Sequence, residues 1–324
     1  MENVIVIGAG PCGLAAAVAL QRAGLSPLVI EKHNIVHSIY LYPTFLQFFS
    51  TAELLEIGGY PFVTPNEKPY RQEALVYYRE VARREGLRMR AYEEALRLER
   101  RTDGGYAVHT ADRFGRPHAY EARYVVVATG YFDQPNWLGI PGEELPKVSH
   151  YYREAHPYTG TKVAIIGGSN SAVDAAMDLL RAGAEVTVVY RGAGYSPSIK
   201  PWVRPIFESM VNKGRIRLLL ESRVEQIGET FVRVRGADGS LELENDFVLA
   251  LTGFRPERKL LAAAGVGIDA ERGTPVYDPA TMETDAPGLY VAGVVASAKE
   301  DANEIFIETG RLHGLRIAEH IAGK

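Results

Sequence analysis

The sequence predicts an α/β protein of two Rossmann-like dinucleotide-binding domains, one of which is inserted into the other. A strand, a glycine-rich turn, a helix and a second strand follow one another directly at the N-terminus. The same order returns near residue 162, and two similar apolar strands flank this second unit. Because each such unit binds a nucleotide in this fold, its repetition indicates two nucleotide sites in one chain.

The first unit begins with an apolar, β-branched run at residues 4–7. A glycine turn at 8–13 follows, then an alanine-rich helix at 14–23 and a second apolar strand at 28–30. Continuous apolar runs of this length are typical of parallel strands that are buried on both faces.

The first turn has the spacing Gly8-x-Gly10-x-x-Gly13, and Glu31 closes the second strand. Gly8 permits a tight turn, Gly10 leaves room for a pyrophosphate, and Gly13 lets the helix pack closely on the strand. The pyrophosphate then meets the N-terminus of the helix, where free amides favour negative charge. Glu31 can accept hydrogen bonds from an adenosine ribose but repels a 2′-phosphate. This site therefore fits FAD or NAD and not NADP.

The second unit repeats this order with a strand at 162–166, a helix at 173–182 and a strand at 185–190. Apolar strands at 124–130 and 246–254 flank it, and the two have the same sequence pattern. The simplest interpretation is that the first domain is interrupted by the second and then resumes.

The predicted domain bounds follow from these flanking strands. We expect residues 1–130 and 256–324 to form the first domain and residues 131–255 to form the inserted one. No low-complexity linker separates them.

The second glycine turn departs from the usual pattern. Ser169 stands where the second glycine is usual, and Ala172 replaces the third, while Gly167 is kept. Ser169, Asn170 and Ser171 can donate hydrogen bonds to phosphate oxygens.

Arg191 ends the second strand of this unit, where an NAD site would place an acid. An arginine at this position suits the 2′-phosphate of NADP, and Lys200 in the following loop can add positive charge. The alternative is that Arg191 is an ordinary surface cation. The sequence thus predicts NADPH in the inserted domain.

The composition excludes several classes of protein. The formal net charge of −4 gives no broad attraction to nucleic acid or an anionic membrane. The chain has one cysteine, Cys12, so it can form neither an internal disulfide nor a Cys-x-x-Cys pair. No apolar run approaches the ~18–20 residues that span a bilayer. We see neither a secretory signal nor a metal motif, and we expect a cytoplasmic protein.

Two nucleotide units in this arrangement resemble the low-molecular-weight thioredoxin reductase superfamily. Several segments resemble one branch of it, the bacillithiol disulfide reductase (YpdA-type) family: 42–44, 48–51, 57–62, 170–172, 198–202 and 302–310. The resemblance implies an FAD enzyme in which a hydride passes from NADPH to FAD and electrons then reduce bacillithiol disulfide. It also implies a cytoplasmic homo-oligomer.

The usual superfamily motif for the FAD ribityl chain is Gly-Asp, but here Ala292-Gly293 is followed by Val294. We therefore expect FAD to depend on backbone groups near Gly293 and on Ile305 and Phe306. The residues predicted to bind FAD are Gly8, Gly10, Pro11, Cys12, Gly13, Glu31, Lys32, Phe48, Thr129, Gly130, Gly293, Ile305 and Phe306. The residues predicted to bind NADPH are Gly167, Ser169, Asn170, Ser171, Ala172, Arg191 and Lys200.

Cys12 is the candidate catalytic residue, because a helix N-terminus lowers the pKa of a thiol and favours the thiolate. The alternative is that Cys12 is simply a small residue that fits a tight turn. His150, His156 and His313 are alternative groups for proton transfer.

Two other functions fit the same motifs. One is a ferredoxin or flavodoxin NADP reductase, which also lacks the cysteine pair. The other is a flavin-binding redox sensor with little turnover.

Overall fold

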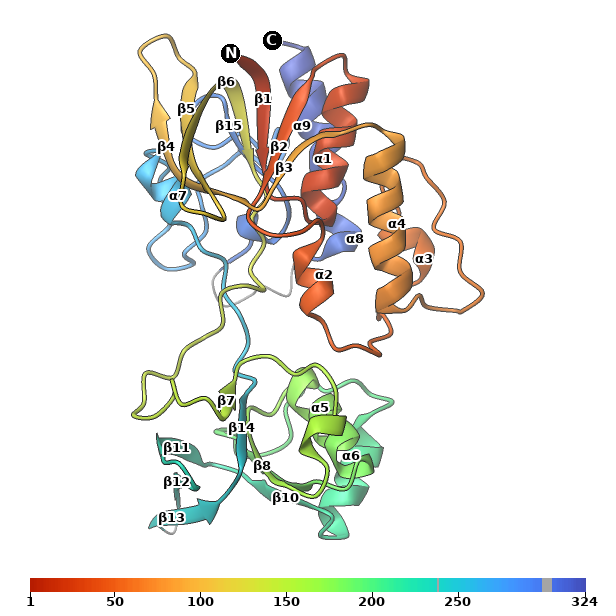
Figure 1. Ribbon diagram of the computed structural model, residues 1–324, viewed down its shortest axis with the longest axis vertical. Coiled ribbons are helices and arrows are strands. Elements are labelled where there is room, and N and C mark those ends of the chain that lie inside the picture. The colour runs from red at the N-terminus through yellow and green to blue at the C-terminus, as the bar shows by residue number, and fades with distance from the viewer. Residues whose placement is uncertain (238, 299–304) are drawn as a thin grey trace. The chain divides into compact units, whose positions relative to one another are not determined.

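The computed structural model describes residues 1–237, 239–298 and 305–324. The chain divides into two compact units (Figure 1). Unit 1 comprises residues 1–40, 46–134 and 254–324, and unit 2 comprises residues 41–45 and 135–253. Each unit contains its own parallel sheet and its own glycine turn.

The sheet of unit 1 has the strand order β3-β2-β1-β6-β5-β4, with β15 also paired to β6. Its strands are β1 Glu2–Ile7, β2 Pro27–Glu31, β3 Arg88–Ala91, β4 Glu93–Arg100, β5 Tyr106–Asp112, β6 Pro117–Val127 and β15 Leu289–Val291. β1, β2, β3, β6 and β15 run parallel, whereas β4 and β5 form an antiparallel extension of β6. The predicted strands at 4–7 and 28–30 are confirmed.

The centre of this sheet is buried on both faces. Ile5 of β1 pairs with Leu28 of β2 and Val125 of β6, and all three side chains are buried. This is the reason that the sequence shows unbroken apolar runs here instead of an alternating pattern.

The helices of unit 1 are α1 Pro11–Arg22, α2 His37–Leu41, α3 Ala52–Leu55, α4 Arg71–Arg84, α7 Lys259–Ala263, α8 Ile307–Gly310 and α9 His313–Ala322, with a 3₁₀ turn η2 at Gly293–Ala296. α1 starts at Pro11, earlier than predicted, because proline is pre-organised for the first helical position. Figure 1 shows α9 beside α1. Their close approach requires Gly314, since a β-carbon there would lie 2.4 Å from the Cα of Ala16.

Unit 2 contains a parallel sheet in the order β10-β9-β8-β14-β7 and a separate antiparallel sheet in the order β11-β12-β13. The strands are β7 Val148–Ser149, β8 Lys162–Ile166, β9 Glu185–Val189, β10 Ile216–Leu219, β11 Arg223–Ile227, β12 Phe231–Gly236, β13 Gly239–Glu244 and β14 Phe247–Ala250. The helices are η1 His156–Tyr158, α5 Asn170–Arg181 and α6 Arg204–Asn212.

Alternate residues of β8 pack against different layers of unit 2. Val163 and Ile165 contribute to the core beneath α5, whereas Ala164 and Ile166 pack in the cluster that includes Val232 of the small sheet. β8 is therefore covered on both faces, as its apolar sequence predicts.

The predicted fold class, an α/β chain with two Rossmann-like units, is confirmed. None of the helices in the described ranges is both long and apolar enough to cross a membrane.

Candidate nucleotide and thiol site

The first glycine turn joins β1 to α1, and packing dictates two of its glycines. Gly8 has φ +107°, and a β-carbon there would lie 2.4 Å from the carbonyl oxygen of Ala128. A β-carbon at Gly13 would lie 2.0 Å from the carbonyl oxygen of Gly8. A side chain at Gly13 would therefore push α1 away from the end of β1, and one at Gly8 would push the turn away from the end of β6.

Gly10 is different, because the protein's own packing does not require a glycine there. Its φ of −71° is open to any residue, and a β-carbon would meet nothing within 4 Å. Gly10 is the N-cap of α1, with Pro11 at the first helical position. Open space in front of free helix amides fits the pyrophosphate of a dinucleotide.

Thr129 follows β6 at the edge of the sheet where the turn lies, and Gly130 follows it. The Thr129 Oγ1 atom is buried and has no hydrogen-bond partner within the described part of the chain. Buried hydroxyls are normally paired, so this atom fits a ligand group at the turn.

Glu31 is buried at the end of β2, and both its carboxylate oxygens are oriented by backbone amides. The Ala9 amide donates to Oε2 at 2.7 Å, and the His33 amide donates to Oε1 at 2.8 Å. Burial raises the pKa of Glu31, while these two hydrogen bonds act in the opposite direction. Lys32, also predicted to bind FAD, is exposed and pairs with Glu94 at 3.0 Å.

Cys12 is partly exposed at the start of α1, and the prediction that its pKa is lowered is wrong. Burial of the thiol, and then the negative charge of Glu308, raise the pKa of Cys12 to about 12. Desolvation and a nearby carboxylate both disfavour a thiolate, and they outweigh the helix N-terminus. Both causes favour the neutral thiol over the thiolate.

The C-terminal part of the predicted FAD site is only partly as expected. The Gly293 amide donates to Nδ1 of His313 at 3.2 Å, so this amide is already used and is not a free donor for FAD. His313 is buried, and burial lowers its pKa to about 4. Ile305 is partly buried and Phe306 is exposed.

Phe48, which is also predicted to bind FAD, is buried, and its amide donates to the carbonyl oxygen of Pro69 at 2.9 Å. Residues 302–304, which belong to the C-terminal segment of the resemblance, lie outside the described residues.

The second glycine turn joins β8 to α5 in unit 2. Gly167 has φ +140°, and a β-carbon there would lie 2.4 Å from the carbonyl oxygen of Leu251. A β-carbon at Gly168 would lie 2.3 Å from the ring of Tyr190. Ser169 is the N-cap of α5, and Ala172 is buried one turn later. The turn is thus as tightly packed as the first one, although its sequence differs.

Arg191 directly follows Tyr190 and is exposed. Its side chain has no hydrogen bond or ion pair with any residue that the structure describes. Lys200, the second predicted cation, is instead paired with Asp174 at 2.7 Å. Of the two cations, Arg191 is the one left available for a 2′-phosphate.

The loop after Arg191 is tied to the glycine turn by polar contacts that the sequence analysis missed. Ser169 and Ser196 have their hydroxyl oxygens 3.4 Å apart, and those of Ser196 and Ser198 are 2.8 Å apart. The Asn170 side chain donates to the Ser198 carbonyl at 2.7 Å and accepts from the Lys200 amide at 3.0 Å. Ser171 is exposed beside them. The Ser-x-Ser spacing was visible in the sequence, but its pairing with the turn was not.

The remaining histidine candidates do not lie at either turn. His150 is buried next to Trp137, with Nε2 3.5 Å from Oε1 of Glu143. His156 is exposed in η1. Only His313 reaches the predicted FAD region, through Gly293.

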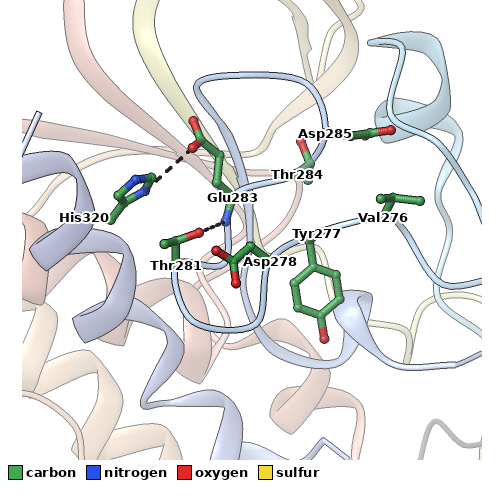
Figure 2. Close-up of a pocket in the computed structure, with 8 residues that line it drawn as sticks. All are labelled: Val276, Tyr277, Asp278, Thr281, Glu283, Thr284, Asp285 and His320. Atoms are coloured by element: carbon green, nitrogen blue, oxygen red, sulfur yellow. Dashed lines mark hydrogen bonds and ion pairs between the residues drawn. The ribbon is translucent and has the colours of Figure 1, made fainter.

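A pocket of about 280 Å³ lies near the amino end of β15 (Figure 2). It is lined by Val276, Tyr277, Asp278, Thr281, Glu283, Thr284, Asp285 and His320. Glu283 accepts from the Gly288 amide at 2.7 Å and pairs with Lys324 at 2.6 Å, and Asp285 accepts from the Gly267 amide at 3.1 Å. Because β15 is parallel to β6, this pocket lies at the sheet edge opposite the glycine turn. Its acidic lining does not suit a nucleotide.

The family that matches this chain is described as "Pyridine nucleotide-disulphide oxidoreductase", and the match covers residues 5–293. The chain belongs to this family. Its members are enzymes, and the predicted cofactors of this chain, FAD and NADPH, are those of the family.

Similarity over the full length places the chain in the Bdr (YpdA) branch of the family. It is 49% identical to "Bacilliredoxin reductase Bdr" of Bacillus subtilis (strain 168), over 99% of this chain and 98% of that protein. A solved "Bacillithiol Disulfide Reductase Bdr (YpdA)" from Bacillus cereus has 50% identity and a TM-score of 0.97, with 99% of each chain covered. Its counterpart from Staphylococcus aureus has 44% identity and a TM-score of 0.93, with 99% and 98% covered. The predicted resemblance is confirmed.

Gly10→Val should give a folded protein that does not retain FAD, because the valine side chain would fill the open space in front of α1. FAD absorbance per chain and far-UV circular dichroism measure the two effects. Gly13→Ala is the contrasting variant and should fail to fold, since its β-carbon would overlap the Gly8 carbonyl. A Gly10→Val protein that remains yellow would show that the pyrophosphate lies elsewhere.

Arg191→Ala should raise KM for NADPH by about tenfold or more and leave KM for NADH nearly unchanged, because only NADPH carries the 2′-phosphate. Steady-state kinetics with both cofactors test this. Arg215→Ala, which removes an exposed arginine before β10 at the opposite edge of the same sheet, is the control. Equal losses with both cofactors would exclude Arg191 from 2′-phosphate recognition.

Proposed function

We propose that this chain catalyses the NADPH-dependent reduction of bacillithiol disulfide in the cytoplasm, and that it works as a homo-oligomer. The observation that supports this substrate is the similarity over the full length to proteins named bacillithiol disulfide reductase. Bound FAD and NADPH would supply the electron transfer, in which one hydride and one proton convert the disulfide into two thiols.

The residues of unit 1 support the proposed FAD site in three ways. Gly10 leaves space in front of the α1 amides, the buried Thr129 hydroxyl has no partner among the described residues, and Glu31 is held at the end of β2. These features support a pyrophosphate at the helix N-terminus and an adenosine ribose at Glu31.

The residues of unit 2 support NADPH in a similar way. The second turn offers the N-terminus of α5 to the pyrophosphate, and Arg191, which pairs with no described residue, offers its guanidinium to the 2′-phosphate. The chain of hydroxyls from Ser169 through Ser196 to Ser198 holds the Arg191 loop against the turn.

Cys12 is the thiol that we assign to the disulfide-reducing step. It is the only cysteine of the chain, so electrons cannot leave through a Cys-x-x-Cys pair. It is partly exposed and lies against Gly293 and Gly310, on the side of α1 that faces the predicted FAD residues of the C-terminal segment. Because its pKa is raised, a change that favours the thiolate would assist its attack on a disulfide.

A second acceptor is favoured by the name of the B. subtilis relative, which points to the protein bacilliredoxin. In that case the substrate would be a disulfide carried by a partner protein. Both acceptors need the same two cofactor sites, so only turnover distinguishes them.

In an acceptor screen with NADPH, we expect the highest kcat/KM with bacillithiol disulfide. The other acceptors are bacilliredoxin in its oxidised form, glutathione disulfide, thioredoxin, ferredoxin and oxygen, and NADPH oxidation is followed at 340 nm. Faster reduction of ferredoxin would favour a ferredoxin NADP reductase. Negligible turnover with every acceptor would favour a redox sensor.

Cys12→Ser should abolish disulfide reduction while FAD content and the bleaching of FAD by NADPH remain normal. Serine is nearly isosteric, so the niche between Gly293 and Gly310 stays filled. Stopped-flow absorbance measures the bleaching, and NADPH oxidation measures turnover. Undiminished turnover would rule out the thiol and require direct electron transfer to the disulfide.

A further inference from the structure

Three polar residues from distant parts of the sequence lie on segments that come together beside the start of α1: Cys12, Ser50 and Glu308. The Cys12 sulfur lies close to α8, since a β-carbon at Gly310 would lie only 2.7 Å from it. Glu308 belongs to the same short helix. The Ser50 hydroxyl donates a hydrogen bond to Oε1 of Glu308, which orients the carboxylate.

Glu308 has no cationic partner in the part of the chain that the structure describes. The nearest arginine in sequence, Arg311, uses its guanidinium on backbone carbonyls instead, including that of Glu53 at 2.8 Å. Glu308 is only partly exposed, and a partly buried carboxylate without a counter-charge is unfavourable.

After burial, the negative charge of Glu308 is the second cause of the raised pKa of Cys12. A reductase that uses a thiol would be expected to place a cation beside it, and this chain places an anion there. A cationic group on a bound substrate would pair with Glu308. Its positive charge would offset the effect of the carboxylate on the pKa of Cys12.

We propose that Glu308 binds a positively charged ammonium group of the disulfide substrate, a few bonds from the sulfur atoms, and so selects disulfides that carry an ammonium group at this place. This inference rests on the proposed reduction of a low-molecular-weight disulfide and names a class within it. Among the described residues Oε2 has no donor, and Oε1 keeps one acceptor position beside Ser50, so the carboxylate can accept from an ammonium group.

Glu308 is itself partly exposed, so a substrate can reach its carboxylate from solvent. Exposed aromatic side chains lie near both polar residues in sequence. Phe306 is 49% exposed two residues before Glu308, and Phe49 is 54% exposed next to Ser50.

The first test labels Cys12 in the FAD-loaded protein with alkylating agents of different charge. Because there is only one cysteine, each rate reports this site alone. The agents are 2-bromoethylamine, which is cationic, iodoacetamide, which is neutral, and iodoacetate, which is anionic. Glu308→Gln should reduce the ratio of the bromoethylamine rate to the iodoacetate rate by about tenfold, as expected for loss of a charge-assisted contact.

Two variants control for general effects of the substitution. Glu53→Gln removes an exposed carboxylate on neighbouring α3 and should leave the ratio unchanged. Glu308→Asp keeps the charge and should keep most of the preference. If Glu308→Gln loses FAD or folds poorly, the Glu308→Asp protein still decides the matter, because a loss of preference with the charge retained would contradict the proposal.

The second test compares cystamine, which carries an ammonium two carbons from each sulfur, with the neutral 2-hydroxyethyl disulfide of the same length. We expect wild-type kcat/KM to favour cystamine by about tenfold and Glu308→Gln to abolish this preference. An unchanged alkylation ratio in Glu308→Gln would overturn the role of Glu308. If the wild-type protein reduces neither disulfide nor bacillithiol disulfide but the alkylation ratio still falls, the cation site stands and the proposed function fails.

Discussion

The close contact between the start of α1 and the end of β1 is the constraint on which the candidate site depends. Only glycine at position 13 lets the helix begin within van der Waals reach of the Gly8 carbonyl, and Gly8 itself must fit against the end of β6. Because parallel strands end at one edge of a sheet, this packing gathers the free amides of α1, the Thr129 hydroxyl and Gly293 after β15 at that edge. The same packing places Cys12 against α8. The proposed cofactor site and the thiol thus share one steric cause.

Unit 2 meets the same constraint with different residues. Gly167 fits against the Leu251 carbonyl. The third glycine of the usual pattern is not needed, because the Ala172 side chain lies 3.5 Å from the place where a β-carbon at Gly167 would be. The ring of Tyr190 fills the space beside Gly168, and serine hydroxyls connect the turn to the next loop. The two turns therefore reach a similar backbone arrangement although their sequences share little, which explains why the departures at Ser169 and Ala172 do not abolish the fold.

The sequence predicts the parallel strands and both turns well, because burial on two faces leaves long apolar runs and steric contact leaves glycines. It does not predict β4 and β5 or the small sheet β11-β12-β13, whose strands alternate or are largely exposed and carry many charged residues. The prediction that the pKa of Cys12 is lowered was wrong for a similar reason. The local position at a helix N-terminus is visible in the sequence, but the carboxylate of Glu308 and the burial of the thiol come from tertiary structure. The use of the Gly293 amide by His313 and the pairing of Lys200 with Asp174 are also contacts that no spacing rule reveals.

The order in which the units occur along the chain also bears on how the protein is made. Unit 2 ends at residue 253, whereas unit 1 still lacks β15, η2 and α9 at that point of synthesis. α9 covers α1 through the Gly314 contact, and β15 completes the sheet beside β6. On the ribosome the inserted unit can therefore complete its core while the first unit waits with α1 uncovered. The N-terminal turn, although made first, is among the last parts of the molecule to be finished.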